Sequence, residues 1–239
     1  MIEAKELSKR YGSHTAVDRV SFTAKPYRVT GFLGPNGAGK STTMRMLVGL
    51  ARPDSGEARI LGARFADVPN PGRFVGVLLD ASATHNGRSG RETLEIAALT
   101  MGLASGSVDR AIDRVGLSRK EAARRTGGYS LGMRQRLGIA QALLADPAVL
   151  ILDEPANGLD PSGIRWMRDI VRDFANDGGT VLLSSHQLSE VDAVADDIVI
   201  MGSGRVTAQG TRDALTRDGS LEDAFFAATA EASREGTAA

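Results

Sequence analysis

Eight consecutive residues, Gly34-Pro35-Asn36-Gly37-Ala38-Gly39-Lys40-Ser41, match a complete phosphate-binding loop and constrain the fold more than any other segment. An apolar, strand-like run at 29–33 precedes the loop, and a periodic helical run at 40–50 follows it, as such a loop requires. The glycines let the backbone curl until its N–H groups converge, and the helix adds its positive N-terminal end. Lys40 supplies a mobile positive charge, and the Ser41 hydroxyl can bind Mg²⁺. Because four fixed positions and both flanks agree, a chance glycine-rich turn explains the segment poorly.

The composition is that of an ordinary globular protein, with 29 basic and 29 acidic residues and no cysteine. The zero net charge provides no overall field to attract nucleic acid or lipid, and the lack of cysteine excludes disulfides and thiolate chemistry. The first residues lack the apolar core of a signal peptide, and no apolar run approaches the ~20 residues that cross a bilayer. We therefore expect a soluble chain whose membrane role, if any, comes through a partner.

The chain alternates between strand-like and helical patterns on either side of a helical block. Helical periodicity covers 91–145, and further helices are predicted at 161–175 and 188–195. Strands are predicted at 2–7, 20–24, 29–33, 58–61, 74–79, 149–152, 180–184 and 198–201. This order predicts an α/β fold whose mainly parallel sheet is covered on both faces. We interpret 1–239 as one domain, with 81–145 as an inserted helical subdomain and 231–239 as a frayed tail.

Two acids follow the buried apolar run that begins at Val149. Asp153 and Glu154 lie where this strand leaves the sheet, so both carboxylates can reach one cleft. Asp153 can hold the Mg²⁺ ion that Ser41 also serves, and Glu154 is then placed to polarise a water for attack on a terminal phosphate. Solvated acids capping a strand end are the ordinary alternative, which the phosphate loop makes the weaker one.

The whole chain resembles the ATP-binding subunit of an ATP-binding-cassette (ABC) transporter, on five motifs in the family's order between Leu7 and about Gly210. Besides the phosphate loop and the acidic pair, 129–136 resembles the family's signature sequence. Gly158-Leu159-Asp160-Pro161 resembles its dimer-contact loop, and Ser184-Ser185-His186 resembles its switch histidine. The resemblance implies a P-loop NTPase core with an N-terminal antiparallel β portion and an inserted helical subdomain.

The same resemblance implies roles for individual residues. Tyr11 would stack on adenine, and His186 would sense the terminal phosphate, although a lone histidine is usually structural. Ser130 and Gly132 would bind the phosphate of an ATP held mainly by a second cassette, although this segment taken alone favours an ordinary capped helix. The nucleotide-binding set would comprise Tyr11, Gly34, Pro35, Asn36, Gly37, Ala38, Gly39, Lys40, Ser41, Thr42, Ser130 and Gly132, with Lys40, Glu154 and His186 catalytic.

The sequence departs from the family pattern at two places. In the signature, Tyr129 replaces a leucine, Leu131 replaces a glycine and Met133 replaces a glutamine. The loss of the glutamine puts a polar contact to the ribose side of the nucleotide in doubt. Asp80 stands where the family usually has a glutamine that senses Mg²⁺ and the membrane partner. A carboxylate at Asp80 can approach the metal, and an ordinary solvated loop aspartate is an equal alternative.

The leading hypothesis is an ATPase that powers a membrane transporter, with ATP and Mg²⁺ bound. Asp80 and the segment 221–226 resemble the drug- and antibiotic-export branch. The implied partners are a transmembrane permease and a second cassette, either a copy of this chain or a related one. They would hold the cytoplasmic chain at the inner face of the cell membrane. A soluble cassette ATPase acting on nucleic acid or ribosomes is the alternative, but the neutral charge and the absence of long insertions disfavour a nucleic-acid partner.

Overall fold

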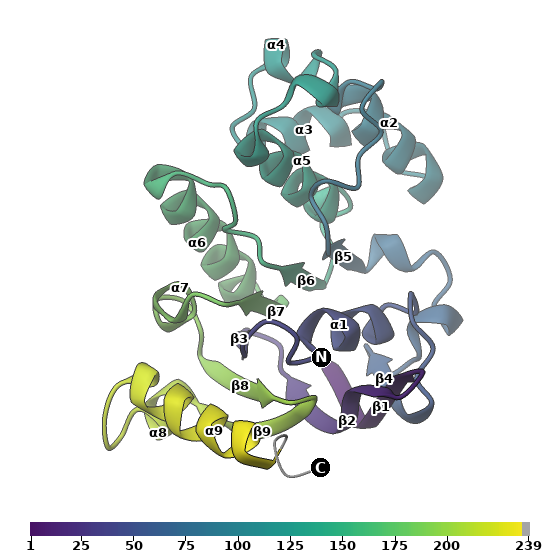
Figure 1. Cartoon of the computed structure of the whole chain (residues 1–239). Helices are drawn as coiled ribbons and strands as arrows, with labels where there is room; N and C mark the ends of the chain where they lie inside the picture. The colour runs from purple at the N-terminus through teal and green to yellow at the C-terminus, as the bar shows by residue number, and fades with distance from the viewer. Residues whose placement is uncertain (236–239) are drawn as a thin grey trace. The chain divides into compact units, whose positions relative to one another are not determined.

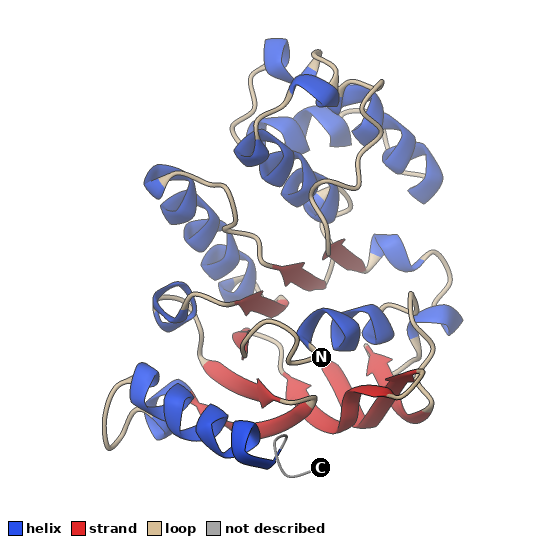
Figure 2. Cartoon of the chain, in the orientation of Figure 1, coloured by secondary structure: helices blue, strands red, loops and turns tan. Residues whose placement is uncertain are grey.

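The computed structural model describes residues 1–235, which form two compact units (Figures 1 and 2). The first unit comprises residues 1–69 together with the described residues from 171 onward, and the second comprises residues 70–170. Helix α6 (Pro161–Asn176) contains the boundary between them.

A three-stranded antiparallel sheet lies in the first unit, in the order β2-β1-β4. Its strands are β1 (Ile2–Tyr11), β2 (His14–Ala24) and β4 (Ser55–Ile60). Ile2 is paired with Ala24 on one side and with Ile60 on the other, and all three side chains are buried. Alternating side chains therefore give this sheet one apolar face, as expected for an antiparallel sheet.

The same unit contains strands in the order β7-β3-β8-β9. The parallel members are β3 (Arg28–Leu33), β7 (Thr180–Ser185) and β8 (Asp197–Gly202), whereas β9 (Arg205–Thr211) pairs antiparallel with β8. Every residue of β7 is buried, which is why the parallel strands read as continuous apolar runs. β9 alternates between exposed and half-buried positions and was not predicted.

Four helices of the first unit are α1 (Lys40–Leu47), α7 (Leu188–Asp192), α8 (Arg212–Leu215) and α9 (Leu221–Glu235). The prediction that the first helix extends to residue 50 is wrong, because Gly49 takes a left-handed φ of 71° and ends it. Helix α7 lies close against β3, since a Cβ on Gly31 would come within 2.1 Å of Val191 Cγ1.

Helix α9 was not predicted, and it closes a hydrophobic cluster of the first unit. Leu221 belongs to the buried cluster, and Phe225 and Ala228 pack against it at helical spacing. The cluster also contains Leu33, Val191, Ala195, Ile198 and Ile200. Of the tail predicted at 231–239, residues 231–235 belong to α9, and 236–239 lie outside the described residues.

The second unit combines two parallel strands, β5 (Val75–Leu78) and β6 (Val149–Asp153), with helices that contact one another. The helices are α2 (Gly90–Met101), α3 (Ser107–Arg114), α4 (Arg119–Ala122) and α5 (Leu131–Leu143). Capping boxes start two of them, with Ser89 and Glu92 at α2 and Ser118 and Glu121 at α4. These helices lie within the predicted subdomain 81–145, whose boundaries stay a prediction. Over residues 1–235, no helix has the length and apolarity to cross a membrane.

Because α9 contributes a core side chain, we expect Leu221→Ala to lower the free energy of unfolding by about 2–4 kcal/mol. Leu221 is 4% exposed, whereas Phe226 on the same helix is 59% exposed. Phe226→Ala, the matched control, should cost less than about 1 kcal/mol. Urea unfolding followed by circular dichroism measures both variants. Equal losses in the two would contradict the role given to α9.

Candidate functional site

The phosphate loop follows β3 and leads directly into α1. Gly37 and Gly39 have left-handed φ values of 82° and 97°, which only glycine adopts readily. A Cβ at Gly39 would also come within 2.4 Å of the Ala16 carbonyl oxygen. Both glycines are thus required by the backbone path, and among the described residues no side chain caps the start of α1. No side-chain cap therefore competes with a ligand for the first-turn N–H groups of α1 in the described residues.

Lys40 extends its side chain back over the loop instead of into solvent. It is 6% exposed, and its Nζ donates hydrogen bonds to the carbonyl oxygens of Gly34 (2.6 Å) and Pro35 (3.3 Å). Ser41 is exposed, and Thr42 is half-buried. The loop therefore holds an ammonium group and backbone N–H donors close together, an arrangement suited to a polyphosphate.

His186 leaves the sheet beside the phosphate loop. Leu33 is paired with Ser185 in the parallel register of β3 and β7, so Gly34 and His186 are the next residues at the same edge. Ser185 Oγ accepts a hydrogen bond from the backbone N–H of Gln187 (2.9 Å) and donates one to Glu190 (2.8 Å). These bonds fix the turn that presents the exposed His186.

Tyr11 lies at the end of the β1–β2 hairpin. Its ring is 52% exposed, and Lys9 Nζ lies 5.5 Å from the ring centroid. An exposed ring is accessible for stacking against a base, and the neighbouring ammonium adds a positive charge at the ring.

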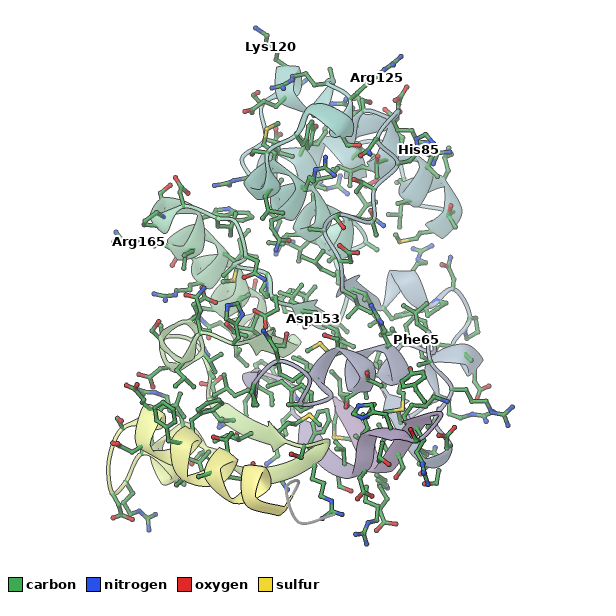
Figure 3. The ribbon with its side chains drawn as sticks, viewed as in Figure 1. Phe65, His85, Lys120, Arg125, Asp153 and Arg165 are labelled. Carbon is green, nitrogen blue, oxygen red and sulfur yellow. The ribbon has the colours of Figure 1, made fainter. Side chains whose placement is uncertain are left out.

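In the second unit, Asp153 ends β6 and Glu154 begins the loop that follows (Figure 3). Glu154 has a left-handed φ of 51°, an uncommon conformation for a residue with a side chain. Its carbonyl oxygen accepts a hydrogen bond from Gln135 Nε2 at 2.9 Å, and the Gln135 side chain is buried. Gln135 was not recognised from the sequence, although it lies within the segment that resembles the signature.

Asp80 lies at the same sheet edge as the acidic pair. Leu78 is paired with Leu152 in the parallel register of β5 and β6, and Asp80 and Glu154 each follow two residues later. Asp80 Oδ1 accepts hydrogen bonds from the Ser82 backbone N–H (2.8 Å) and from Ser82 Oγ (2.6 Å). These bonds favour a loop-ordering role, and a role at the metal stays a prediction.

Ser130 caps helix α5, where its Oγ accepts a hydrogen bond from the Met133 N–H at 3.2 Å. Gly132 lies against the loop at 158–161, since a Cβ there would approach the Gly158 carbonyl oxygen to 3.1 Å. Asp160 in that loop accepts hydrogen bonds from the backbone N–H of Gly163 and from Ser162 Oγ, which lower the pKa of the Asp160 carboxyl. Two of the family-like motifs are therefore in direct contact within this unit.

Tyr129, the first departure in the signature, is buried, and burial raises the pKa of its phenol. Its hydroxyl donates a hydrogen bond to the Glu121 carbonyl oxygen at 2.7 Å. This bond joins the residue before the Ser130 cap to helix α4. A leucine can fill such a position but cannot form this bond.

Comparison with known proteins identifies the family. The ABC transporter family model matches residues 17–157. The chain belongs to the ABC transporter family. It is 40% identical over 91% of its length to the bacitracin transport ATP-binding protein of Bacillus licheniformis, and covers 72% of that protein. It is 35% identical over 89% of its length to the lantibiotic transport ATP-binding protein of Streptococcus pyogenes, and covers 92% of it.

A solved structure of the ATP-binding subunit of an ABC transporter superposes with a TM-score of 0.87. It is 30% identical and covers 95% of this chain and 99% of its own. The predicted α/β P-loop fold, the recognition of the family and the ATPase activity coupled to transport are therefore confirmed. Roles of individual site residues stay predictions.

If the phenol of Tyr129 holds the start of α5, Tyr129→Phe should remove the bond from the hydroxyl to the Glu121 carbonyl oxygen, which keeps only backbone donors such as the Arg124 N–H (3.0 Å). We expect a loss of about 1–2 kcal/mol in the free energy of unfolding. Chemical denaturation measures this loss. Met133→Leu is the control, because Met133 contributes only its backbone N–H to the cap and should cost less than about 1 kcal/mol. A Tyr129→Phe protein as stable as wild type would contradict the role of the hydroxyl.

Proposed function

We propose that this ABC cassette binds ATP with Mg²⁺ and powers the export of antibiotics or other small molecules through a membrane permease. The observation that carries the ATP site is the buried Lys40 ammonium, held by carbonyl oxygens inside a glycine-dependent loop. The export branch is supported by the relatives, whose names assign them to bacitracin and lantibiotic transport.

In this proposal, Lys40 and the loop N–H groups of 34–42 neutralise the phosphate oxygens, and Tyr11 stacks on the base. Ser41 and Asp153 hold Mg²⁺, with Asp80 as a further candidate. The donor set fits the ion, because Mg²⁺ prefers hydroxyl, carboxylate, phosphate and water oxygens. Bound by Ser41 and Asp153, the ion would supply positive charge to neutralise the phosphate oxygens.

Glu154 is proposed as the general base that accepts a proton from the attacking water. His186 is proposed to hydrogen-bond the terminal phosphate and stabilise its developing charge. Because an ionised carboxylate takes the proton directly, no covalent intermediate on the protein is required.

Ser130 and Gly132 are proposed to bind the phosphate of ATP carried by a second cassette. The N-terminus of α5 and the Ser130 hydroxyl supply the donors that such a contact needs. The partners are then a second cassette and a permease, which would keep this chain at the inner face of the membrane. The alternative of a nucleic-acid- or ribosome-directed ATPase is disfavoured by the transport names of the relatives. Purification from native membranes tests the partners: a co-purifying membrane-spanning subunit supports transport, and co-purifying ribosomes contradict it.

Glu154→Gln should bind ATP with near wild-type affinity but hydrolyse it at least ~100-fold more slowly, because an amide cannot take the proton. Fluorescent-nucleotide titration and steady-state phosphate release measure the two properties. Asp218→Asn, an exposed acid beyond α8, is the control and should leave both unchanged. Hydrolysis in Glu154→Gln at the wild-type rate would exclude Glu154 as the base.

Ser130→Arg should retain ATP binding in the open monomer but abolish turnover, because a bulky cation would enter the interface between cassettes. The lost cap alone costs about 1 kcal/mol, too little to unfold a stable domain. Met133→Gln, which introduces the family's usual residue, should change the turnover little. Normal hydrolysis by Ser130→Arg would mean that this segment is only a capped helix.

A further inference from the structure

The zero net charge of the chain conceals a local excess of positive charge in the second unit. Residues 114–125 contain five basic side chains and a single acidic one. We define the basic patch by the exposed side chains of Arg88, Arg119, Lys120, Arg124 and Arg125. None of them belongs to the proposed nucleotide site.

Backbone contacts hold the segment around Arg88 beside Arg124 and Arg125, and Arg119 and Lys120 lie in α4, just before these two arginines. Ser89 forms a β-bridge with Arg125, and the N–H of Thr126 donates a hydrogen bond to the Arg88 carbonyl oxygen at 2.8 Å. The N–H of Gly90 also donates to the Arg124 carbonyl oxygen at 3.3 Å. The side chains of Lys120 and Arg125 extend outward from the α4 end of the unit (Figure 3).

Some cations outside the basic patch are neutralised by ion pairs, whereas those of the patch are largely not. Arg91 pairs with Asp109 at 2.5 Å, and Arg64 pairs with Asp67 at 2.6 Å. Arg124 donates to the Gly128 carbonyl oxygen at 3.0 Å, which leaves its charge in place. Among the described residues, the other four cations of the patch form no ion pair within 4.0 Å.

Two acids, Glu92 and Glu121, lie among these cations, and both act in helix caps. Glu92 accepts a hydrogen bond from the Ser89 N–H, and Glu121 accepts from Ser118, and these bonds lower the pKa of each carboxyl. Both acids are therefore ionised at neutral pH, but five cations still outnumber two anions. The basic patch together with these two acids therefore has a net positive charge.

The chemistry of the patch distinguishes a lipid surface from a protein partner. Cores of protein interfaces are rich in aromatic and apolar side chains and depleted of charge. The patch has no exposed large hydrophobic side chain, and Tyr129 and Ala122 beside it are buried. Long, separate, solvated cations suit a diffuse layer of anionic headgroups, which attracts Lys and Arg side chains near the membrane surface.

We propose that the basic patch is a membrane-contact surface that binds the headgroups of anionic phospholipids. A transport ATPase works beside a membrane, so such lipids are within its reach. The binding is electrostatic and reversible, and it does not depend on the residue roles proposed for ATP hydrolysis. Its strength therefore falls steeply as salt rises.

Co-sedimentation of the full chain with vesicles tests the proposal, using phosphatidylcholine alone and phosphatidylcholine mixed with phosphatidylglycerol. The patch variant replaces four cations that no side-chain hydrogen bond engages in the described residues, namely Arg88→Gln, Arg119→Gln, Lys120→Gln and Arg125→Gln. The matched control removes equal charge elsewhere, with Lys25→Gln, Arg45→Gln, Arg52→Gln and Arg217→Gln, all exposed. Circular dichroism melts and ATP binding show that both variants are folded.

Wild type and control should sediment only with the mixed vesicles at low salt, and the patch variant should bind them at least ~10-fold more weakly. High salt should release the wild type. Three results would overturn the proposal: no binding of the wild type to anionic vesicles, equal loss in patch and control variants, or binding to duplex RNA but not to the vesicles. Loss of hydrolysis in Glu154→Gln with vesicle binding intact would show that the two proposals stand separately.

Discussion

Parallel pairing of β3 with β7, and of β5 with β6, brings the carboxyl ends of the paired strands to one sheet edge in each unit. The phosphate loop and His186 leave from the first edge, and Asp80 and Glu154 leave from the second. Leu33 and Ser185, which are 152 positions apart in sequence, thereby become neighbours in register, as do Leu78 and Leu152, which are 74 positions apart. The positions of the candidate site residues therefore depend on the strands being buried on both faces, because only burial fixes the register of such apolar runs.

Glu154, the proposed general base, is held in an uncommon backbone conformation. A left-handed backbone at a residue with a Cβ costs about 1–2 kcal/mol, and surrounding contacts must compensate for it. Gln135 supplies one such contact through the Glu154 carbonyl oxygen, and it does so from α5, the helix capped by Ser130. The segment that resembles the signature thus supports the backbone of the proposed base within its own unit.

Local patterns allowed most of the α/β core to be predicted, because buried parallel strands and the phosphate loop carry strong signals. β9 was missed since its alternating positions are only half-buried, and α9 was missed although Leu221, Phe225 and Ala228 follow helical spacing. Contacts between segments that the fold brings together produce no local sequence pattern from which they can be predicted. The bond from Gln135 to Glu154 could not be predicted, because it joins segments whose approach only the fold determines.

The departures from the usual signature become intelligible when each side chain is placed. The Tyr129 side chain is buried, and its hydroxyl donates a hydrogen bond to α4 that the family's usual leucine cannot form. The effect of this substitution therefore stays within the helices of the second unit. Leu131 is exposed, and Met133 contributes its backbone N–H to the cap, which any residue except proline can do. The cap hydroxyl of Ser130 and the absence of a side chain at Gly132 are the two features proposed for binding a neighbouring phosphate, and both are kept. The substituted residues therefore lie at positions where the fold tolerates them, and the groups that would contact phosphate are unchanged.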